Sequence, residues 1–345
     1  MKKSVTIAVI GIGRIGRMHT ENLVHSVPDA YVKAVVSPRI DEAWADGLGI
    51  PVRATEVNKV LSDPEVEAVV ITAPSGRHVE LIRQAAAAGK HIYCEKPVAF
   101  ETGPIEQAQA AAAAAGVKLQ VGFNRRFDPG LLQMWQAVQC GKVGEIHQLR
   151  VTNRDPKAPP VDFVKRSGGL FFDFAIHDFD TVRFLSGSEI VELFAVGAVL
   201  VDPEIGKAGD IDTAVITLRL ANGALGVIDC SRQTNYGYDQ RFEVFGSKGS
   251  VLVDNTTATT LVSSSKHGVV ADKPHETFVE RYREAFVAEL AAFVASVREG
   301  LPVRVGAGDA LAAVRAAGAA RMSHLEHRPV VLSDNGQATG GGQRR

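Results

Sequence analysis

The chain has 345 residues, of which 46% are hydrophobic, and its 38 lysines and arginines against 39 aspartates and glutamates give a formal net charge of −1. This length predicts about two domains, and the composition excludes a disulfide-stapled peptide, a collagen and a wholly disordered chain. Because the charges balance, no global basic field attracts nucleic acid or an anionic membrane. The longest stretch without Asp, Glu, Lys or Arg is residues 129–141, too short for a membrane span. We therefore expect a small-molecule partner.

The cysteines indicate the compartment. There are three, Cys94, Cys140 and Cys230, far apart and without a C-x-x-C pair. An odd number with this spacing favours a reducing compartment and fits neither a disulfide framework nor a zinc site. The apolar stretch after Lys2 and Lys3 runs into glycines without a cleavage site, so we interpret it as a strand and not as a signal peptide. The expected location is the cytoplasm.

The N-terminal part alternates β-branched runs with helical patterns. Strands separated by helices of this length are typical of a parallel, doubly wound α/β sheet. The predicted strands are 4–10, 31–36, 66–72, 91–94 and 117–122, and the predicted helices are 56–61, 78–88, 105–115 and one that carries Ile15, Met18 and Leu23.

The pattern changes after about residue 123. Six strand-like runs follow, and turn signals such as Asn222-Gly223 and Lys248-Gly249 separate some of them. Consecutive strands joined by tight turns predict an α+β domain with a large, mostly antiparallel, open sheet. The predicted strands are 146–153, 192–201, 213–220, 225–230, 240–245 and 250–253, and the predicted helices are 278–299 and 308–324.

The first motif with a chemical meaning is Gly11-Ile12-Gly13-Arg14-Ile15-Gly16, a G-x-G-x-x-G that follows the first strand and opens a helix. In this context the glycines permit a tight turn, the approach of backbone to a pyrophosphate, and close helix–strand packing, while the helix N-terminus offers N–H groups to the anion. The alternative is a glycine-rich turn without a ligand. The motif predicts a Rossmann domain at residues 1–122, and the change of pattern predicts a substrate-binding and oligomerisation domain at 123–332. Residues 333–345 lack aromatic residues and are rich in Gly and Gln, which predicts a disordered tail.

The end of the second strand bears on the choice between NAD and NADP. An acidic residue there would hold the ribose hydroxyls of NAD, but this chain has Ser37, followed by Pro38 and Arg39. A hydroxyl and a guanidinium can both bind a 2′-phosphate that a carboxylate would repel. The sequence therefore permits NADP as well as NAD. Alternatively, Arg39 is a solvated loop charge and NAD binds without a carboxylate.

Glu95-Lys96-Pro97 follows the strand 91–94. Open α/β sheets bind ligands at the carboxyl ends of their strands, so Lys96 can reach a substrate there. The alternative is a surface lysine in a turn.

Asp173 and His177 are four residues apart, a spacing that places both on one face of a helix. The carboxylate can orient the imidazole, and a neutral imidazole can accept the proton that an alcohol loses when its hydride leaves. A surface salt bridge is one alternative. A metal site is another, but a third ligand with recognisable spacing is lacking beyond Asp178 and Asp180, so we expect no metal.

Together these motifs resemble the Gfo/Idh/MocA oxidoreductases over nearly the whole chain. Within the family the chain looks most like the inositol dehydrogenases. The resemblance rests on the motifs above together with 122–127 (GFNRRF), 154–156 (RDP), 158–160 (APP), 167–171 (SGGLF), 177–180 (HDFD) and 245–249 (FGSKG).

The resemblance implies a cleft between the domains for substrate, and assembly into a homo-tetramer through the open sheet. It implies that Lys96 binds the reacting hydroxyl, that His177 is the general base and that Asp173 orients it. It further implies substrate contacts from Arg125, Asn153, Asp155, Asp173, Tyr236 and Tyr238, and cofactor contacts from the glycine motif, Ser37, Arg39, Ala73, Pro74, His78, Glu95 and Lys96.

The expected reaction is NAD- or NADP-dependent oxidation of one ring hydroxyl of a cyclitol, myo- or scyllo-inositol, to the ketone. Asn153 and Asp155 stand where some inositol enzymes have His and Asn, so a glucose-like pyranose is an alternative substrate. A glycoside hydrolase that oxidises transiently with bound NAD, and a dinucleotide sensor without catalysis, are the alternatives of other classes.

Overall fold

The structure, a computed structural model, describes residues 4–332 and 338–340. Two compact units form: residues up to Phe127 together with Glu284–Val314, and Asp128–Arg283 together with the chain from Arg315 onward. The first unit thus includes a segment that the sequence assigned to the second domain. Among the helices of the described residues, none combines the length and apolar character of a membrane span.

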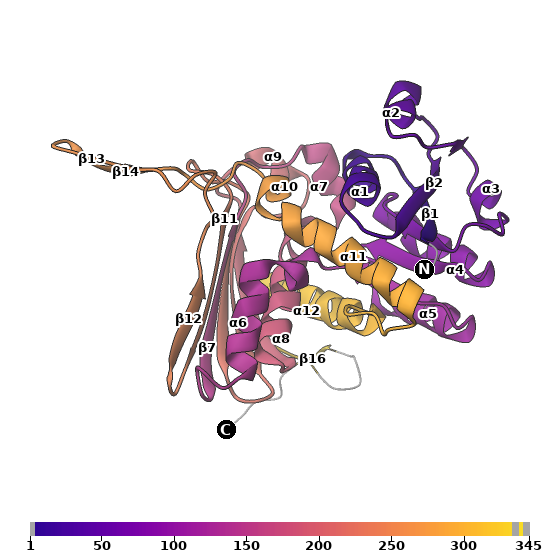
Figure 1. The fold of residues 1–345 in the computed structure, drawn as a ribbon. Helices are drawn as coiled ribbons and strands as arrows, with labels where there is room; N and C mark the ends of the chain where they lie inside the picture. The colour runs from indigo at the N-terminus through magenta and orange to yellow at the C-terminus, as the bar shows by residue number, and fades with distance from the viewer. Residues whose placement is uncertain (1–3, 333–337, 341–345) are drawn as a thin grey trace. The chain divides into compact units, whose positions relative to one another are not determined.

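The first unit contains a six-stranded sheet in the order β3-β2-β1-β4-β5-β6, and every neighbouring pair is parallel (Figure 1). The predicted doubly wound sheet is confirmed. Its central strands, β1 and β4, are buried along their whole length, as parallel strands covered on both faces require. The strands are β1 (Val5–Ile10), β2 (Ala30–Val36), β3 (Val52–Ala54), β4 (Ala68–Ile71), β5 (His91–Glu95) and β6 (Leu119–Gly122).

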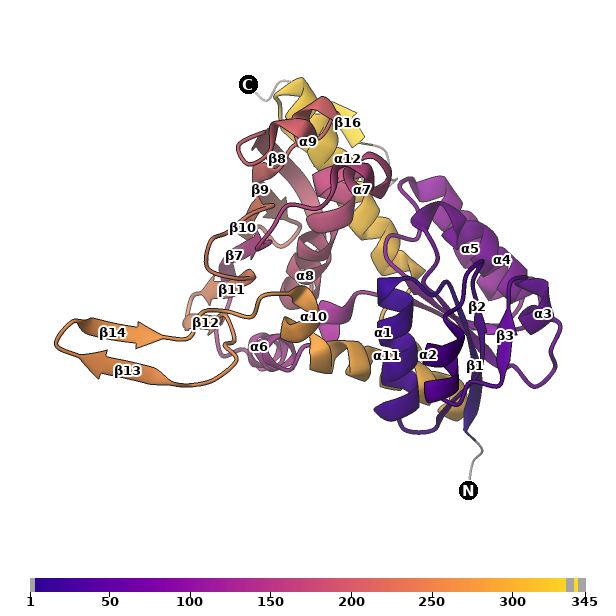
Figure 2. The ribbon, with the colours of Figure 1, turned by 90° about the horizontal axis from the view of Figure 1, so that it is seen from above.

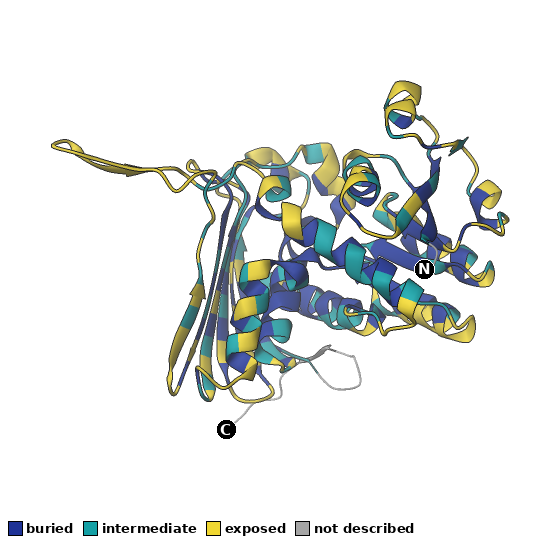
Figure 3. Ribbon diagram, viewed as in Figure 1, coloured by how far each residue is buried: buried dark blue, intermediate teal, exposed yellow. Residues whose placement is uncertain are grey.

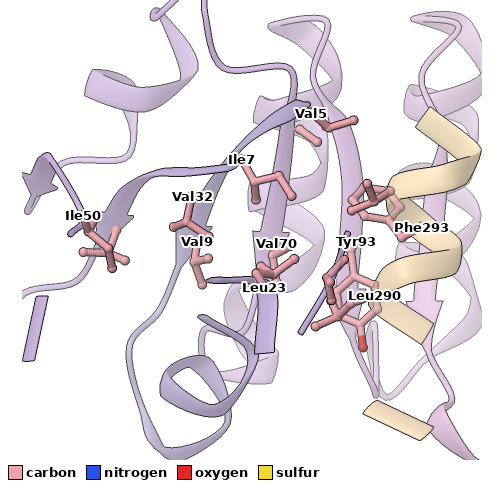
Figure 4. Close-up of a cluster of buried hydrophobic side chains, with 14 residues drawn as sticks. Val5, Ile7, Val9, Leu23, Val32, Ile50, Val70, Tyr93, Leu290 and Phe293 are labelled. Atoms are coloured by element: carbon pink, nitrogen blue, oxygen red, sulfur yellow. The ribbon is translucent and has the colours of Figure 1, made fainter. Parts of the chain in front are cut away.

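Helices cover both faces of this sheet. Figure 2 shows α1 and α11 on one face and α4 and α5 on the other. Leu290 and Phe293 of α11 belong to the same buried cluster as Val9, Leu23 and Tyr93 (Figure 4). This apolar packing explains why a helix from far along the chain belongs to the first unit. The helices are α1 (Arg14–His25), α2 (Glu42–Gly47), α3 (Asn58–Leu61), α4 (His78–Ala87), α5 (Thr102–Ala114) and α11 (Arg283–Glu299).

The second unit contains an eight-stranded open sheet in the order β12-β11-β7-β10-β9-β8-β15-β16. All neighbours are antiparallel except β7 and β10, which are parallel. The mostly antiparallel sheet is confirmed, as are the two hairpins. The strands are β7 (Ile146–Arg154), β8 (Ile190–Ala198), β9 (Thr213–Leu220), β10 (Leu225–Ser231), β11 (Asp239–Gly246), β12 (Gly249–Val253), β15 (Val330–Leu332) and β16 (Ala338–Gly340).

One face of this sheet packs against helices, and α6 and α8 lie on it (Figure 1). The other face carries exposed side chains, as the alternation of buried and exposed residues along β9 shows. Figure 3 shows buried and exposed residues mixed along the strands of this sheet. An exposed hairpin, β13 (Val262–Ser265) with β14 (Gly268–Ala271), extends away from the sheet. The helices are α6 (Pro129–Gln139), α7 (Val161–Ser167), α8 (Ile176–Ser186), α9 (Pro203–Lys207), α10 (Phe278–Arg281) and α12 (Ala307–Glu326), the last of which both units share.

Some predicted elements are wrong in detail. The single helix 278–299 is interrupted at Tyr282 between α10 and α11. Tyr282 is buried, and its hydroxyl donates to Gln240 Oε1 at 3.2 Å. Helices α2, α7 and α9 and strand β3 were not predicted, because segments of three to seven residues carry little periodic pattern. The eleven-residue helix α6 was not predicted either. The expected disordered tail lies outside the described residues, except for β16.

Candidate functional site

The glycine motif forms the turn from β1 into α1. Gly11 has φ +100°, and a Cβ there would lie 2.6 Å from the backbone nitrogen of Ala73. A Cβ on Gly16 would lie 1.9 Å from the carbonyl oxygen of Gly11. Neither position therefore tolerates a side chain, and the two glycines let α1 pack directly against β1 and the loop after β4.

Gly13, unlike Gly11 and Gly16, has open space where a side chain would stand. No atom lies within 4 Å of the place where its Cβ would stand, and the residue is the N-cap of the twelve-residue helix α1. The space in front of a helix N-terminus, lined by backbone, is what a pyrophosphate needs. The loop therefore fits a dinucleotide.

The end of β2 carries Ser37 and Arg39, which the sequence predicts to face the ribose of the cofactor. The N–H of Ser37 donates to the carbonyl oxygen of Ala54 at 3.0 Å, and Arg39 is exposed. The nearest carboxylate along the chain is Asp41, which caps α2 by accepting from the N–H of Trp44 and pairs with Arg17 at 3.3 Å. These two contacts lower the pKa of Asp41. The carboxylate of Asp41 therefore already binds the N-terminus of α2 and the side chain of Arg17.

His78 supports the turn after β4. Its Nδ1 lies 2.9 Å from the carbonyl oxygen of Pro97 and its Nε2 lies 2.7 Å from that of Ala73. Burial lowers the pKa of His78, against the opposing effect of the two carbonyl oxygens that face its ring nitrogens. His78 therefore joins the loop of Ala73 and Pro74 to the loop that follows Lys96.

Glu95 and Lys96 end β5. Glu95 Oε1 lies 2.7 Å from Nε2 of buried His19, and Oε2 accepts the N–H of Lys96 at 3.2 Å. Burial raises the pKa of Glu95, but His19, Lys96 and His78 together outweigh it and lower the pKa overall. Arg125 lies just beyond β6, the neighbouring strand, and is buried. The structure thus places Lys96 and Arg125 after adjacent parallel strands.

In the second unit Asp173 and His177 occupy a different local structure from the one predicted. Asp173 lies in a π-helical turn, Leu170–Phe174, and α8 begins only at Ile176, so one continuous α-helix is wrong. Asp210 fixes the start of this turn by accepting the N–H of Leu170 through both carboxylate oxygens. Along residues 170–182 only Asp173 and His177 keep partial exposure. Both side chains therefore lie on the accessible side of a buried segment.

Arg232 was not predicted. Its Nη2 lies 3.1 Å from Asp173 Oδ2, its Nη1 lies 3.6 Å from Asp155 Oδ2, and its guanidinium lies over the ring of Phe174. Asp155 follows β7 and Arg232 follows β10. Because these two strands are parallel, their carboxyl ends meet at one edge, and the guanidinium there fixes both carboxylates. If the sequence had shown that β7 and β10 are parallel neighbours, it would have predicted that Arg232 lies beside Asp155.

Asn153 lies deeper than expected. It is fully buried, its Nδ2 donates to Asp178 Oδ2 at 2.8 Å, and its Oδ1 accepts from Nε2 of Gln240. Tyr238 is also buried, with its ring edge-on to Tyr282 at 6.2 Å. Asn153 and Tyr238 are therefore buried inside the second unit, where their contacts stabilise the fold.

Tyr236 is 42% exposed. Its hydroxyl donates to Asp239 Oδ2 at 2.6 Å and accepts from Nη1 of Arg154 at 3.2 Å. The ring lines a hollow of this unit together with Arg154, Asp229 and Ser231. Of the predicted substrate residues in this unit, Asp155, Asp173, His177 and Tyr236 are thus partly or fully exposed.

Comparison with known proteins assigns both parts of the chain to one family. Residues 5–123 match the model of the GFO/IDH/MocA oxidoreductase family with an NAD-binding Rossmann fold, and residues 131–252 match the GFO/IDH/MocA C-terminal domain.

Several relatives extend over nearly the whole chain. The myo-inositol 2-dehydrogenase of Thermotoga maritima is 43% identical over 95% of this chain and 98% of its own length. The inositol 2-dehydrogenase of Rhizobium meliloti is 40% identical over 96% of this chain and 100% of its own. The structure of scyllo-inositol dehydrogenase from Lactobacillus casei with NAD(H) and scyllo-inositol has a TM-score of 0.89 at 30% identity, and the match covers 95% of this chain and 99% of that one. The chain belongs to the GFO/IDH/MocA family of NAD-binding oxidoreductases.

Proposed function

We propose that the chain is an inositol dehydrogenase that oxidises one ring hydroxyl of a cyclitol to a ketone. The observation that carries the proposal is that Asp173 and His177 are both partly exposed on a buried segment and that Arg232 pairs with Asp173. An imidazole beside a carboxylate is suited to remove the proton of an alcohol. The relatives match nearly the whole chain, and their names support a cyclitol as the substrate.

The cofactor is proposed to lie along the carboxyl ends of β1, β2, β4 and β5. Gly11, Gly13 and the N-terminus of α1 would hold the pyrophosphate, and Ser37 and Arg39 would face the ribose. The bound nicotinamide would supply the hydride acceptor. The further cofactor contacts proposed are Ile12, Arg14, Ile15, Gly16, Ala73, Pro74, His78, Glu95 and Lys96.

Three side chains would act on the reacting hydroxyl. The ammonium group of Lys96 would donate a hydrogen bond to its oxygen and stabilise the negative charge that develops there. His177 would accept the proton, and Asp173 would orient the ring and stabilise its cationic form. Five further residues stay predictions as substrate contacts: Arg125, Asn153, Asp155, Tyr236 and Tyr238. Asp155 and Tyr236 offer the more accessible polar groups of the second unit.

The test is the rate of reduced-nicotinamide formation with myo-inositol and scyllo-inositol as substrates. Turnover of a cyclitol supports the proposal. Release of a cleaved sugar from a glycoside without accumulation of reduced cofactor would instead indicate a hydrolase that oxidises transiently.

Ser37 is the residue through which we expect the chain to use NADP as well as NAD. The variant Ser37→Asp places a carboxylate where a 2′-phosphate would bind, and loss of a charge-assisted contact is worth about 1.5–3 kcal/mol. We expect kcat/KM for NADP to fall by roughly tenfold to a hundredfold and that for NAD to be maintained or to rise. Steady-state kinetics with both cofactors measure this, and Ser62→Asp, on the exposed end of α3, is the matched control. An unchanged ratio would remove Ser37 from the cofactor site.

We also propose that four copies of the chain assemble. A tetramer with two-fold symmetries needs two different self-complementary surfaces, and the second unit presents two exposed apolar ones. Val215, Phe245 and Leu252 lie on the outer sheet face, and Val262 and Val269 lie on the β13–β14 hairpin. Light scattering after size exclusion should give about four times 36.8 kDa, and Phe245→Glu should reduce it. A monomer at micromolar concentration would contradict the proposal.

The cytoplasm is the proposed location. None of the three cysteines forms a disulfide, as expected for a reducing compartment.

A further inference from the structure

A buried group of titratable side chains behind the end of β5 is not used by the mechanism above. Polar atoms of His19, Glu95 and Glu289 all lie within 4.8 Å of one another. They come from three elements, α1, β5 and α11, so that residues almost 200 positions apart meet inside the first unit. Two carboxyl groups this close in a buried place require an explanation, because two like charges there repel strongly.

The position of Glu289 is fixed by its backbone. Nε2 of Gln120 on β6 donates to the carbonyl oxygen of Glu289 at 2.8 Å, and Leu290 packs beside Tyr93 in the core (Figure 4). The side chain of Glu289 is fully buried, and among the described residues no donor meets strict hydrogen-bond geometry to either carboxyl oxygen. Burial and the charge of Glu95 raise the pKa of Glu289, against the smaller, opposite effect of the nearby Tyr93 hydroxyl. An ionised carboxylate without donors is costly in such a place.

Glu95, in contrast, has donors for a negative charge. His19 contacts its Oε1 at 2.7 Å, the hydroxyl of Tyr93 donates to the same oxygen at 3.3 Å, and the N–H of Lys96 donates to Oε2 at 3.2 Å. The two carboxyl groups therefore differ. Hydrogen-bond donors of the protein stabilise a negative charge on Glu95, whereas no donor in strict geometry does so for Glu289.

We propose that the carboxyl group of Glu289 carries a proton and is a positioning group for Glu95, and through Glu95 for Lys96. The polar atoms of Glu95 and Glu289 lie within 4.8 Å of each other, so a small rotation of the Glu289 side chain would let its O–H donate to a carboxylate oxygen of Glu95. Glu289 would then be a fourth donor to Glu95, beside His19, Tyr93 and the N–H of Lys96, and would help to keep Oε2 on that N–H. The role of Lys96 rests on the proposed function.

The direction of the pKa shifts agrees with this assignment. Burial and then the charge of Glu95 raise the pKa of Glu289 well above its usual range. Glu95 keeps a lowered pKa, because His19, Lys96 and His78 favour its charge over the effect of burial. Burial raises the pKa of Tyr93, so its hydroxyl stays a neutral donor. Groups on α1, β5, α4 and the loop after β5 face the two carboxyl groups. Together they favour the state in which Glu95 is ionised and Glu289 is neutral.

Two variants separate positioning from simple packing. Glu289→Gln keeps a buried donor of the same shape, and we expect its kcat to stay within about threefold of the parent. Glu289→Leu keeps the volume without a donor, and a Lys96 displaced by a fraction of an ångström should lower kcat by roughly tenfold to a hundredfold, with little change in KM for NAD. Ser296→Ala, which removes a buried hydroxyl elsewhere on α11, is the control. Equal kcat for Glu289→Leu and the parent would overturn the proposal.

The proton is tested without any turnover. The infrared spectrum of the parent should contain a carboxylic acid C=O band at neutral pH that Glu289→Gln lacks. Since the folded chain holds this proton at pH values where the unfolded chain has lost it, the stability of the parent should fall as pH rises above the unfolded pKa of Glu. The gain in Tm of Glu289→Gln over the parent should therefore grow from about pH 5 to pH 9.

A gain that is independent of pH, or the absence of the band, would show that Glu289 is ionised and would overturn the proposal. Stoichiometric divalent metal in the purified protein, lost in Glu289→Gln, would do the same and assign the three side chains to a cation. These results hold even if inositol proves not to be the substrate, so failure of the proposed function is distinguishable.

Discussion

Replacement of His177 by alanine is expected to lower kcat by about 10²- to 10⁴-fold, the contribution of a positioned general base. The variant should fold, because His177 is only partly buried at the start of α8. Affinity for NAD should stay within about threefold of the parent, since the residues proposed for the cofactor lie in the other unit. Stopped-flow or steady-state absorbance of reduced nicotinamide measures the loss.

The matched control is His267→Ala, which removes an exposed imidazole from the turn between β13 and β14. It should keep the kcat of the parent. Lys96→Ala should resemble His177→Ala, with a large loss of kcat and retained cofactor binding. Normal turnover in both His177→Ala and Lys96→Ala would remove the assigned roles.

Replacement of Arg232 by methionine is expected to lower both stability and kcat. The guanidinium is 3% exposed and stands between Asp155 and Asp173, which are 21% and 16% exposed. Removal of one partner from a buried ion pair costs about 3–5 kcal/mol, and partial exposure of the carboxylates reduces this to roughly 2–3 kcal/mol. The free energy of unfolding from urea titration measures it. The kcat should fall with it, because Asp173 loses the contact that fixes it.

Arg219→Met is the comparison for this prediction. Arg219 is 54% exposed and lies 3.7 Å from Glu192 on the outer sheet face, so its loss should change the free energy of unfolding by less than about 0.5 kcal/mol. If Arg232→Met were as stable and as active as Arg219→Met, Arg232 would be no part of the site.

Much of the first unit could be predicted from the sequence, because its information is local. The run Val5–Ile10 followed by three spaced glycines predicts both the strand and the turn, and the close approaches at Gly11 and Gly16 explain why no side chain stands there. The membership of α11 could not be predicted. Its apolar stripe indicates that one face is buried, but a stripe carries no information on which sheet covers it.

The candidate site of the second unit could be predicted only in part. Asp173 and His177 have a spacing that is visible in the sequence, whereas Arg232 depends on which strands are neighbours. Had β7 and β10 been antiparallel, Asp155 and Arg232 would lie at opposite edges of the sheet. The π-helical turn at Leu170–Phe174 was also invisible, since Asp210, forty residues later, fixes its first N–H. Pairings between distant residues leave no periodic trace in a sequence.

The central claim is that the chain oxidises a cyclitol with a nicotinamide cofactor. Its most direct test is the initial rate of reduced-nicotinamide formation with NAD and NADP in parallel, against myo-inositol, scyllo-inositol, D-glucose, L-glucose and D-xylose. The account predicts rapid turnover of one inositol, at least tenfold above any pyranose in kcat/KM, and activity with both cofactors. Turnover of a pyranose alone, or accumulation of no reduced cofactor with any of the five compounds, would contradict it.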